Sequence, residues 1–235
     1  MYRYLDGAQI IETIRRLRLR IDERFPESGL TGVCDDLLSA ATETAARVTR
    51  LRRPNLPLRA VSWALIGALI YIGLEALLHL RLGTGWDDIA DFLQSSQAIQ
   101  NVVFLGVAVL FLANVETRIR RRRTLDALHE LRSIAHVVDM HQLAKDADQF
   151  LAERVTTESS PRLTMTRFEL SRYLDYCTEV LSLTSKVASL YVQDFQDAVV
   201  LEAGNDMENL TTGPSRKIWQ KIIILDTRGV GRGHS

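Results

Sequence analysis

Four polar residues recur at helical spacing in the stretch HELRSIAHVVDMHQL, which covers residues 129–143. His129, Arg132, His136 and Asp139 follow a three-four-three spacing, so a helix would place all four on one stripe. By the same geometry, His141 points about 140° away from His136. The stripe combines imidazole, guanidinium and carboxylate groups, which can bind metals, transfer protons or form hydrogen-bonded networks.

Three interpretations of this stripe follow from its chemistry. His136 and Asp139 could supply two ligands to a metal ion, but a complete site needs a third ligand from another helix. Candidates for that ligand are Glu169, Asp175, Glu179, Asp206 and Glu208. The chain contains no Glu-x-x-His pair and no His-Glu-x-x-His signature. We therefore favour a hydrogen-bonded polar seam between helices over a metal or acid–base site, and over pH sensing by histidine protonation.

The composition indicates a helical protein and argues against several other classes. The 235 residues include 29 Lys and Arg and 29 Asp and Glu, so zero net charge gives no general attraction to nucleic acid. Cys34 and Cys177 lack the spacing of a zinc site or a disulfide scaffold, and no cofactor is expected. The stretch MYRYLDGAQIIETIRRLRLR has no apolar core of the export-signal type.

Two apolar segments suggest a membrane hairpin. AVSWALIGALIYIGLEALLHL covers residues 60–80, and AIQNVVFLGVAVLFLANV covers residues 98–115. A helix that crosses a bilayer core needs roughly 20 mostly apolar residues. The first segment meets this length if Glu75 is tolerated near its end, and the second needs Asn101 and Asn114 to lie at the two interfaces. The alternative is a pair of helices buried in a protein core.

Arginines flank the two apolar segments and favour the hairpin. No acidic residue interrupts either run of flanking arginines, which include Arg50, Arg52 and Arg53 before the first segment and Arg118, Arg120, Arg121, Arg122 and Arg123 after the second. Because arginines on short flanks are retained in the cytoplasm, both ends are predicted inside and the connecting loop outside. The run at 118–123 could also bind anionic lipid headgroups. Membrane topology already explains the run, so nucleic-acid binding is not expected.

Ionisable and amide side chains within the predicted membrane segments are candidate functional positions. Glu75 and His79 are one helical turn apart in the first segment. Glu75 could pair with Asn101 or, with Asn101 and Asn114, line a pore when several copies assemble. The alternative is that Glu75 simply extends to the outer interface.

The remaining chain has the apolar periodicity of a helical bundle. Ile10, Ile14, Leu17 and Ile21 form one helical stripe, FPESGLTG breaks that helix, and a second is expected at about 31–53. The helix through the second apolar segment is expected to continue to about Arg154. Thr166 and Glu169 predict a capping box that opens a further helix. That helix has an apolar stripe at Leu170, Tyr173, Leu174, Cys177, Leu181, Thr184, Ala188 and Tyr191. A short helix at about 199–210 is expected to end at TTGP, residues 211–214, and the last residues to be disordered.

The order of these elements carries a family resemblance. A helix pair, two membrane helices and a longer helical extension resemble the SLATT-type two-helix membrane proteins of bacterial conflict systems. The strings HELRSIAHVVDMHQL and LTTGPSRKIWQKIIIL also look like those of uncharacterised bacterial membrane proteins. The resemblance to the SLATT group implies a membrane-permeabilising effector that is released by a partner sensing invasion or nucleotide signals.

We therefore predict an all-α protein with a two-helix transmembrane hairpin and a cytoplasmic bundle formed by its N- and C-terminal segments. The expected segments are 1–58 (cytoplasmic helices), 59–81 and 98–117 (transmembrane), 82–97 (external loop), 118–226 (cytoplasmic helical domain) and 227–235 (disordered tail). The expected location is the bacterial inner membrane, with several membrane crossings and both termini in the cytoplasm.

The function expected from these features is non-enzymatic. The first hypothesis is a self-assembling permeabilising effector or regulated pore, controlled by the cytoplasmic helices. The alternatives are a membrane anchor that docks a cytosolic partner and a membrane enzyme with a metal bound by His129, His136 and Asp139. Membrane lipids, further copies of the chain and a cytosolic regulatory protein are the expected partners.

Overall fold

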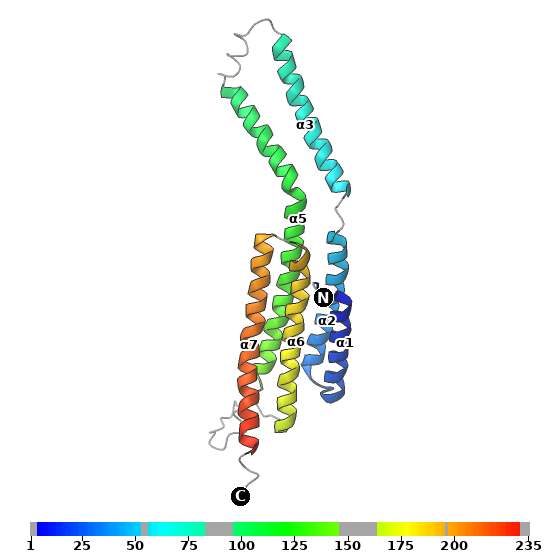
Figure 1. Ribbon diagram of the computed structural model, residues 1–235, viewed down its shortest axis with the longest axis vertical. Coiled ribbons are helices and arrows are strands. Elements are labelled where there is room, and N and C mark those ends of the chain that lie inside the picture. The colour runs from blue at the N-terminus through cyan, green and yellow to red at the C-terminus, as the bar shows by residue number, and fades with distance from the viewer. Residues whose placement is uncertain (1–3, 53–55, 83–95, 146–163, 196, 231–235) are drawn as a thin grey trace. The chain divides into compact units, whose positions relative to one another are not determined.

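The protein is all-helical, as predicted. The computed structural model describes residues 4–52, 56–82, 96–145, 164–195 and 197–230, and no strand occurs in these ranges (Figure 1). The helices are α1 (Gly7–Arg24), α2 (Gly29–Arg52), α3 (Leu56–Leu82), α5 (Ser96–Leu143), α6 (Arg167–Asp194) and α7 (Ala198–Val230).

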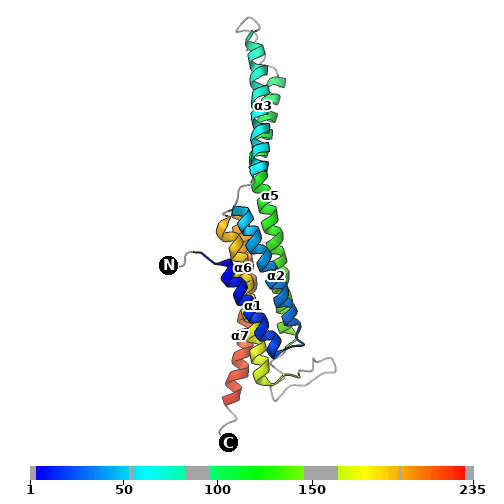
Figure 2. The ribbon, with the colours of Figure 1, turned by 90° about the vertical axis from the view of Figure 1, so that its right-hand side faces the viewer.

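Two compact units divide the chain. The bundle unit consists of residues 1–52 and 123–235, and the apolar unit consists of residues 53–122. In the bundle unit, α6 packs against α7, α2 and α1, and α1 packs against α2. Figures 1 and 2 show these four helices side by side, so segments from the two ends of the sequence share one core.

The N-terminal helix forms as its apolar spacing predicts. Its start is capped by the Asp6 carboxylate, which accepts a hydrogen bond of 2.9 Å from the Ala8 amide. The predicted stripe of Ile10, Ile14, Leu17 and Ile21 is buried along its whole length. The helix ends at Arg24, and α2 begins at Gly29, so the predicted break at FPESGLTG is confirmed.

The helix α6 supplies the centre of the bundle core. The predicted capping box is present: the Glu169 amide donates to the Thr166 hydroxyl, and the Thr166 amide donates to the Glu169 carboxylate. All eight residues of the predicted stripe, from Leu170 to Tyr191, are buried. Burial of this continuous face fixes the helix against its neighbours on several sides.

The predicted helix break at TTGP is wrong, because α7 continues through Pro214 to Val230. A proline inside a helix removes one backbone hydrogen bond and crowds the carbonyl four residues earlier. The helix has core contacts on both sides of this position, where Met207, Thr211, Ile218 and Ile222 are all buried. Burial of that face outweighs the local cost of the proline.

The predicted disordered tail is partly helical, because α7 includes residues 227–230. Residues 231–235 lie outside the described residues.

The long helix α5 ends at Leu143, earlier than the predicted end near Arg154. Residues 146–163 lie outside the described part of the chain, so the end predicted near Arg154 falls among them. The C-terminal part of α5 contributes Ala127, Leu128, Leu131, Ala135 and Val138 to the bundle core.

The predicted inner-membrane location is wrong. In the ranges that the structure describes, no helix combines the length and the hydropathy needed for a bilayer crossing. The predicted transmembrane segments at 59–81 and 98–117 lie in α3 and α5, which are helical but do not meet this requirement. The topology inferred from the arginine flanks, with several crossings and both termini inside, is therefore also wrong.

Candidate functional site

The predicted polar stripe of α5 does not form one network. His129 and His136 are both exposed. Arg132 forms an ion pair of 3.5 Å with Asp206 of α7, which links these two helices. Asp139 instead accepts a hydrogen bond of 2.8 Å from Gln142 of its own helix. Only Arg132 therefore shows an interaction with another helix of the kind expected from the favoured polar seam.

Four of the five carboxylates considered as further metal ligands have other interactions. Glu169 caps α6, Asp175 pairs with Arg172 at 3.1 Å, and Glu179 pairs with Arg20. Asp206 is the partner of Arg132. Among the described residues, no group of three or more His, Cys, Asp or Glu side chains is arranged to hold a metal ion.

His141, which lies off the polar stripe, is the most buried of the three histidines whose side chains the structure describes. Its Nδ1 lies 3.3 Å from the Tyr173 hydroxyl of α6. Burial lowers the pKa of His141, and the nearby positive charge of Lys145 lowers it further. The sequence does contain a signal for this position, because His141 continues the spacing of Leu131, Ile134 and Val138, all buried.

The end of α5 is held by a lysine from α7. The Lys221 ammonium donates to the Gln142 backbone carbonyl and side-chain oxygen, both at 2.9 Å. It also donates to the Lys145 carbonyl at 3.2 Å. Carbonyls at a helix C-terminus lack partners within the helix, and a cation also interacts favourably with the helix dipole there. Lys221 thereby joins α7 to the end of α5.

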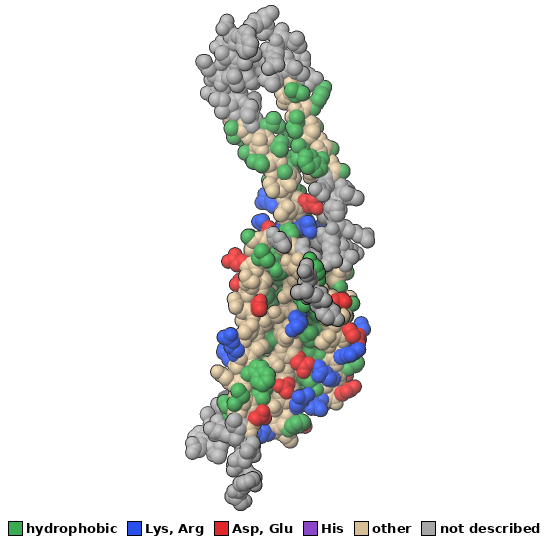
Figure 3. Space-filling view, in the orientation of Figure 1, with side chains coloured by type: hydrophobic (Ala, Val, Ile, Leu, Met, Phe, Trp, Pro, Cys, Tyr) green, Lys and Arg blue, Asp and Glu red, His purple; other side chains and the backbone are tan. Residues whose placement is uncertain are grey.

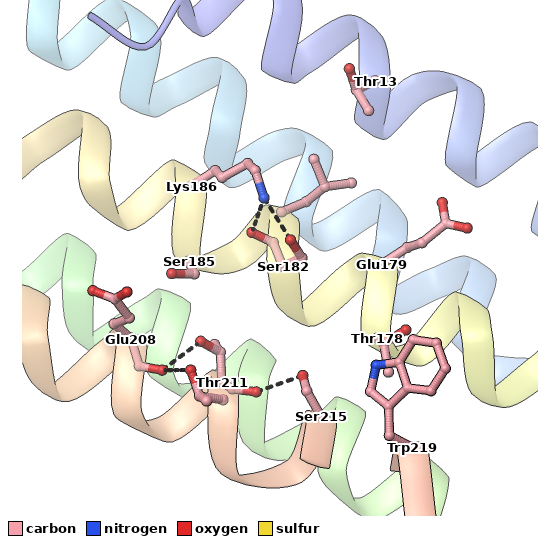
Figure 4. Close-up of a pocket in the computed structure, with 12 residues that line it drawn as sticks. Thr13, Thr178, Glu179, Ser182, Ser185, Lys186, Glu208, Thr211, Ser215 and Trp219 are labelled. Carbon is pink, nitrogen blue, oxygen red and sulfur yellow. Dashed lines mark hydrogen bonds between the residues drawn. The ribbon is translucent and has the colours of Figure 1, made fainter. Parts of the chain in front are cut away.

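A trough of about 690 Å³ lies in the bundle unit between α1 and α7, with α6 as its floor (Figure 4). Its hydroxyl-bearing lining residues are Thr13, Thr178, Ser182, Ser185, Thr211, Thr212 and Ser215. Glu179, Lys186 and Glu208 add charge, and Leu183 and Trp219 are its apolar lining residues. Figure 4 shows Lys186 and Glu208 toward one end of the trough and Trp219 at the other. No sequence pattern indicates this feature, which we call the hydroxyl trough.

The apolar unit carries many exposed apolar side chains, some of them visible in green in Figure 3, which we together call the apolar surface. Its residues are Val61, Trp63, Leu65, Ile70, Tyr71 and Leu74 of α3 and Val103, Phe104, Val107, Leu110 and Phe111 of α5, each at least 47% exposed. A Cβ added to Gly73 would lie 3.2 Å from Leu105, so α3 and α5 approach closely there. Large exposed apolar surfaces are typical of sites that bind other proteins or membranes.

The polar positions predicted within the apolar segments are described only in part. Asn114 is exposed, and its side-chain amide donates to the Leu110 carbonyl at 2.7 Å. This bond lies within α5 and does not reach a second helix. The side chains of Glu75, His79 and Asn101 lie outside the described residues, so the predicted pairing and pore lining stay predictions.

The arginines predicted to set topology are likewise described in part. Arg118 lies over the Phe111 ring, with its guanidinium carbon 5.3 Å from the ring centroid. Arg120 and Arg121 are half-buried, whereas Arg122 and Arg123 are exposed. The side chains of Arg50, Arg52 and Arg53 lie outside the described residues. Lipid-headgroup binding by these residues stays a prediction.

Comparisons with protein-family models, curated proteins and solved structures find no match to this chain. The resemblance to the SLATT group therefore stays a prediction.

Proposed function

We propose that this protein is a non-enzymatic assembly protein whose copies associate through the apolar surface. The observation that carries this proposal is the exposure of eleven large apolar side chains on α3 and α5. Leaving such a surface in water costs free energy in proportion to its area, so burying it drives association.

A second copy of the chain is the partner that best matches this surface. The sequence has no charged residue from Ala60 to Leu74 or from Val103 to Val115. The surface therefore offers no ion pair to a charged partner, whereas an identical surface is equally apolar and uncharged. A Cβ added to Gly67 or Gly106 would meet nothing within 4 Å, so both positions leave room for another helix. Symmetric association between like surfaces is also the commonest form of protein assembly.

The bundle unit is the regulatory part in this proposal. It has its own buried core and a separate surface, so it can bind another molecule while the apolar surface associates. The membrane-permeabilising role and the cytosolic partner implied by the SLATT resemblance stay predictions.

The test is the molar mass of the full chain in solution, measured by light scattering after size exclusion. The unchanged protein is expected to be an oligomer. A variant with Phe104→Gln, Leu110→Gln and Phe111→Gln is expected to be a monomer, because it replaces three large exposed members of the apolar surface with polar groups.

The matched control is Leu19→Gln, because Leu19 is 47% exposed on α1 and lies outside the apolar surface. This control should leave the oligomer unchanged. The proposal fails if the unchanged chain is a monomer, or if the triple variant keeps the mass of the oligomer. It also fails if the chain stays monomeric and floats with phosphatidylcholine–phosphatidylglycerol vesicles, because lipid would then cover the surface.

A further inference from the structure

The hydroxyl trough has an elongated shape that suits a linear ligand. Its floor follows α6 from Thr178 to Lys186, a length of about 12 Å at 1.5 Å per residue. Thr13 stands on the α1 side, and Glu208 to Trp219 stand on the α7 side (Figure 4). The volume of about 690 Å³ lies within the range of sites that bind small molecules.

The hydroxyls of the trough present mainly hydrogen-bond acceptors. Thr13, Thr178, Thr211, Thr212 and Ser215 each donate to a backbone carbonyl of their own helix, three or four residues earlier. A hydroxyl has one proton and two lone pairs, so each of these oxygens can still accept. The lining therefore favours a ligand that is rich in hydrogen-bond donors.

The charges of the trough are balanced. The Lys186 ammonium donates to the Ser182 hydroxyl at 2.6 Å. Glu179 pairs with Arg20, so its charge is compensated at the edge of the trough. Lys186 and Glu208 then contribute one positive and one negative charge. This arrangement favours a neutral ligand over a strongly charged one.

Trp219 supplies an aromatic platform at one end of the trough. It is 55% exposed, although a large aromatic side chain usually buries most of its surface. The other apolar lining residue is Leu183, which is 7% exposed. The trough therefore has too little apolar area to bind the apolar face of an amphipathic helix.

We propose that the hydroxyl trough binds a neutral oligosaccharide that lies along α6. Sugar hydroxyls would donate to the threonine and serine oxygens and to the Glu208 carboxylate. The apolar face of one sugar ring would stack on the Trp219 indole. This inference goes beyond self-assembly, because none of the trough residues belongs to the apolar surface.

The test is calorimetric titration of the full chain with three neutral probes: maltotetraose, cellotetraose and chitotetraose. At least one probe is expected to bind. Trp219→Ala should weaken its binding by roughly tenfold or more, whereas Trp219→Tyr, which keeps an aromatic face, should lose less. Ser182→Leu, which fills the floor of the trough, should weaken binding as well.

Phe168→Ala is the matched control, because Phe168 is a 67% exposed aromatic residue of α6 that lies outside both the trough and the apolar surface. It should leave saccharide binding unchanged, and circular dichroism should show unchanged helix content for every variant. The proposal is overturned if no probe binds at millimolar concentration, or if the bound probe is unaffected by both Trp219→Ala and Ser182→Leu. It is also overturned if Trp219→Ala changes only the oligomeric mass, because a second copy would then occupy the trough.

Discussion

The imidazole of His141 and the phenol of Tyr173 lie 3.3 Å apart, where the end of α5 meets α6. The Tyr173 ring also makes an edge-on contact with Phe25 at the end of α1, at 5.5 Å between ring centroids. Gly29, the first residue of α2, lies against the same imidazole. One histidine thus touches two other elements of the bundle unit, although it lies off the polar stripe of α5.

The stability of the chain is expected to fall as the pH drops below about 6.5. The pKa of His141 is lowered in the folded state, first by burial and then by Lys145, so the unfolded chain takes up the proton more readily. The stability due to neutral His141 is therefore present above the unfolded pKa of 6.5 and is lost as the pH falls toward the folded pKa. Urea unfolding between pH 7.5 and 5 (roughly spanning this window) measures the effect.

The variant His141→Gln should flatten this part of the pH dependence. His136→Gln is the matched control, since His136 is exposed one and a half turns earlier on the same helix and should change the slope little. Equal pH slopes for the unchanged chain and His141→Gln would contradict the assignment to His141.

The contact between His141 and α2 predicts opposite effects for two glycine substitutions. In Gly29→Ala, the new Cβ would lie 2.6 Å from His141 Cε1, so the ring must move and lose its position beside Tyr173. We expect a loss of about 1–2 kcal/mol of unfolding free energy. In Gly32→Ala, the new Cβ meets nothing within 4 Å, and helix propensity predicts a gain of up to about 1 kcal/mol.

Urea unfolding of both glycine variants at pH 7.5 gives this comparison directly. A Gly29→Ala variant as stable as Gly32→Ala would show that the imidazole moves without cost and that its packing contributes little.

Loss of Lys221, the lysine of α7 that binds the end of α5, is expected to loosen that end of the helix. Lys221→Met removes three hydrogen bonds to Gln142 and Lys145, one of which reaches a fully buried amide side chain. The free energy of unfolding is expected to fall by about 1–3 kcal/mol. The backbone amides of Ala144 and Lys145 should also exchange hydrogen with solvent faster. Lys217→Met, one turn earlier and exposed, is the control and should leave both amides as protected as before.

The helices that form the bundle core could largely be predicted from the sequence. The stripes of α1 and α6 were identified because every third or fourth residue is apolar, and the same periodicity determines which side is buried. The capping box at Thr166 was equally visible, because it depends on residues only three positions apart. The helical conformation at Pro214 could not be predicted, because the local preference of proline is outweighed by core contacts on both sides, which no local pattern displays.

The candidate site could not be predicted in the same way. The hydroxyl trough joins Thr13, Ser182 and Thr211, which come from three helices and lie far apart in the sequence. Scattered serines and threonines also occur on most solvated helix faces, so their types alone indicate no site. His141 escapes the polar pattern for a different reason: it lies off the polar stripe of α5 and continues the buried apolar stripe of that helix.

The two cysteines are expected to resist alkylation until the bundle unit opens. Cys34 and Cys177 are both fully buried free thiols, and burial raises the pKa of each thiol to about 12. Since the thiolate is the reacting form, a pKa of about 12 in place of 9.0 lowers its population at pH 8 by roughly a thousandfold. Iodoacetamide should therefore label neither thiol in the native chain and both in urea, as detected by mass spectrometry.

The two cysteines of Gly29→Ala should be labelled faster than those of Gly32→Ala, because labelling then depends on how often the helices separate. Rapid labelling of Cys34 in the native chain would show that the contact between α1 and α2 opens far more easily than its buried side chains imply.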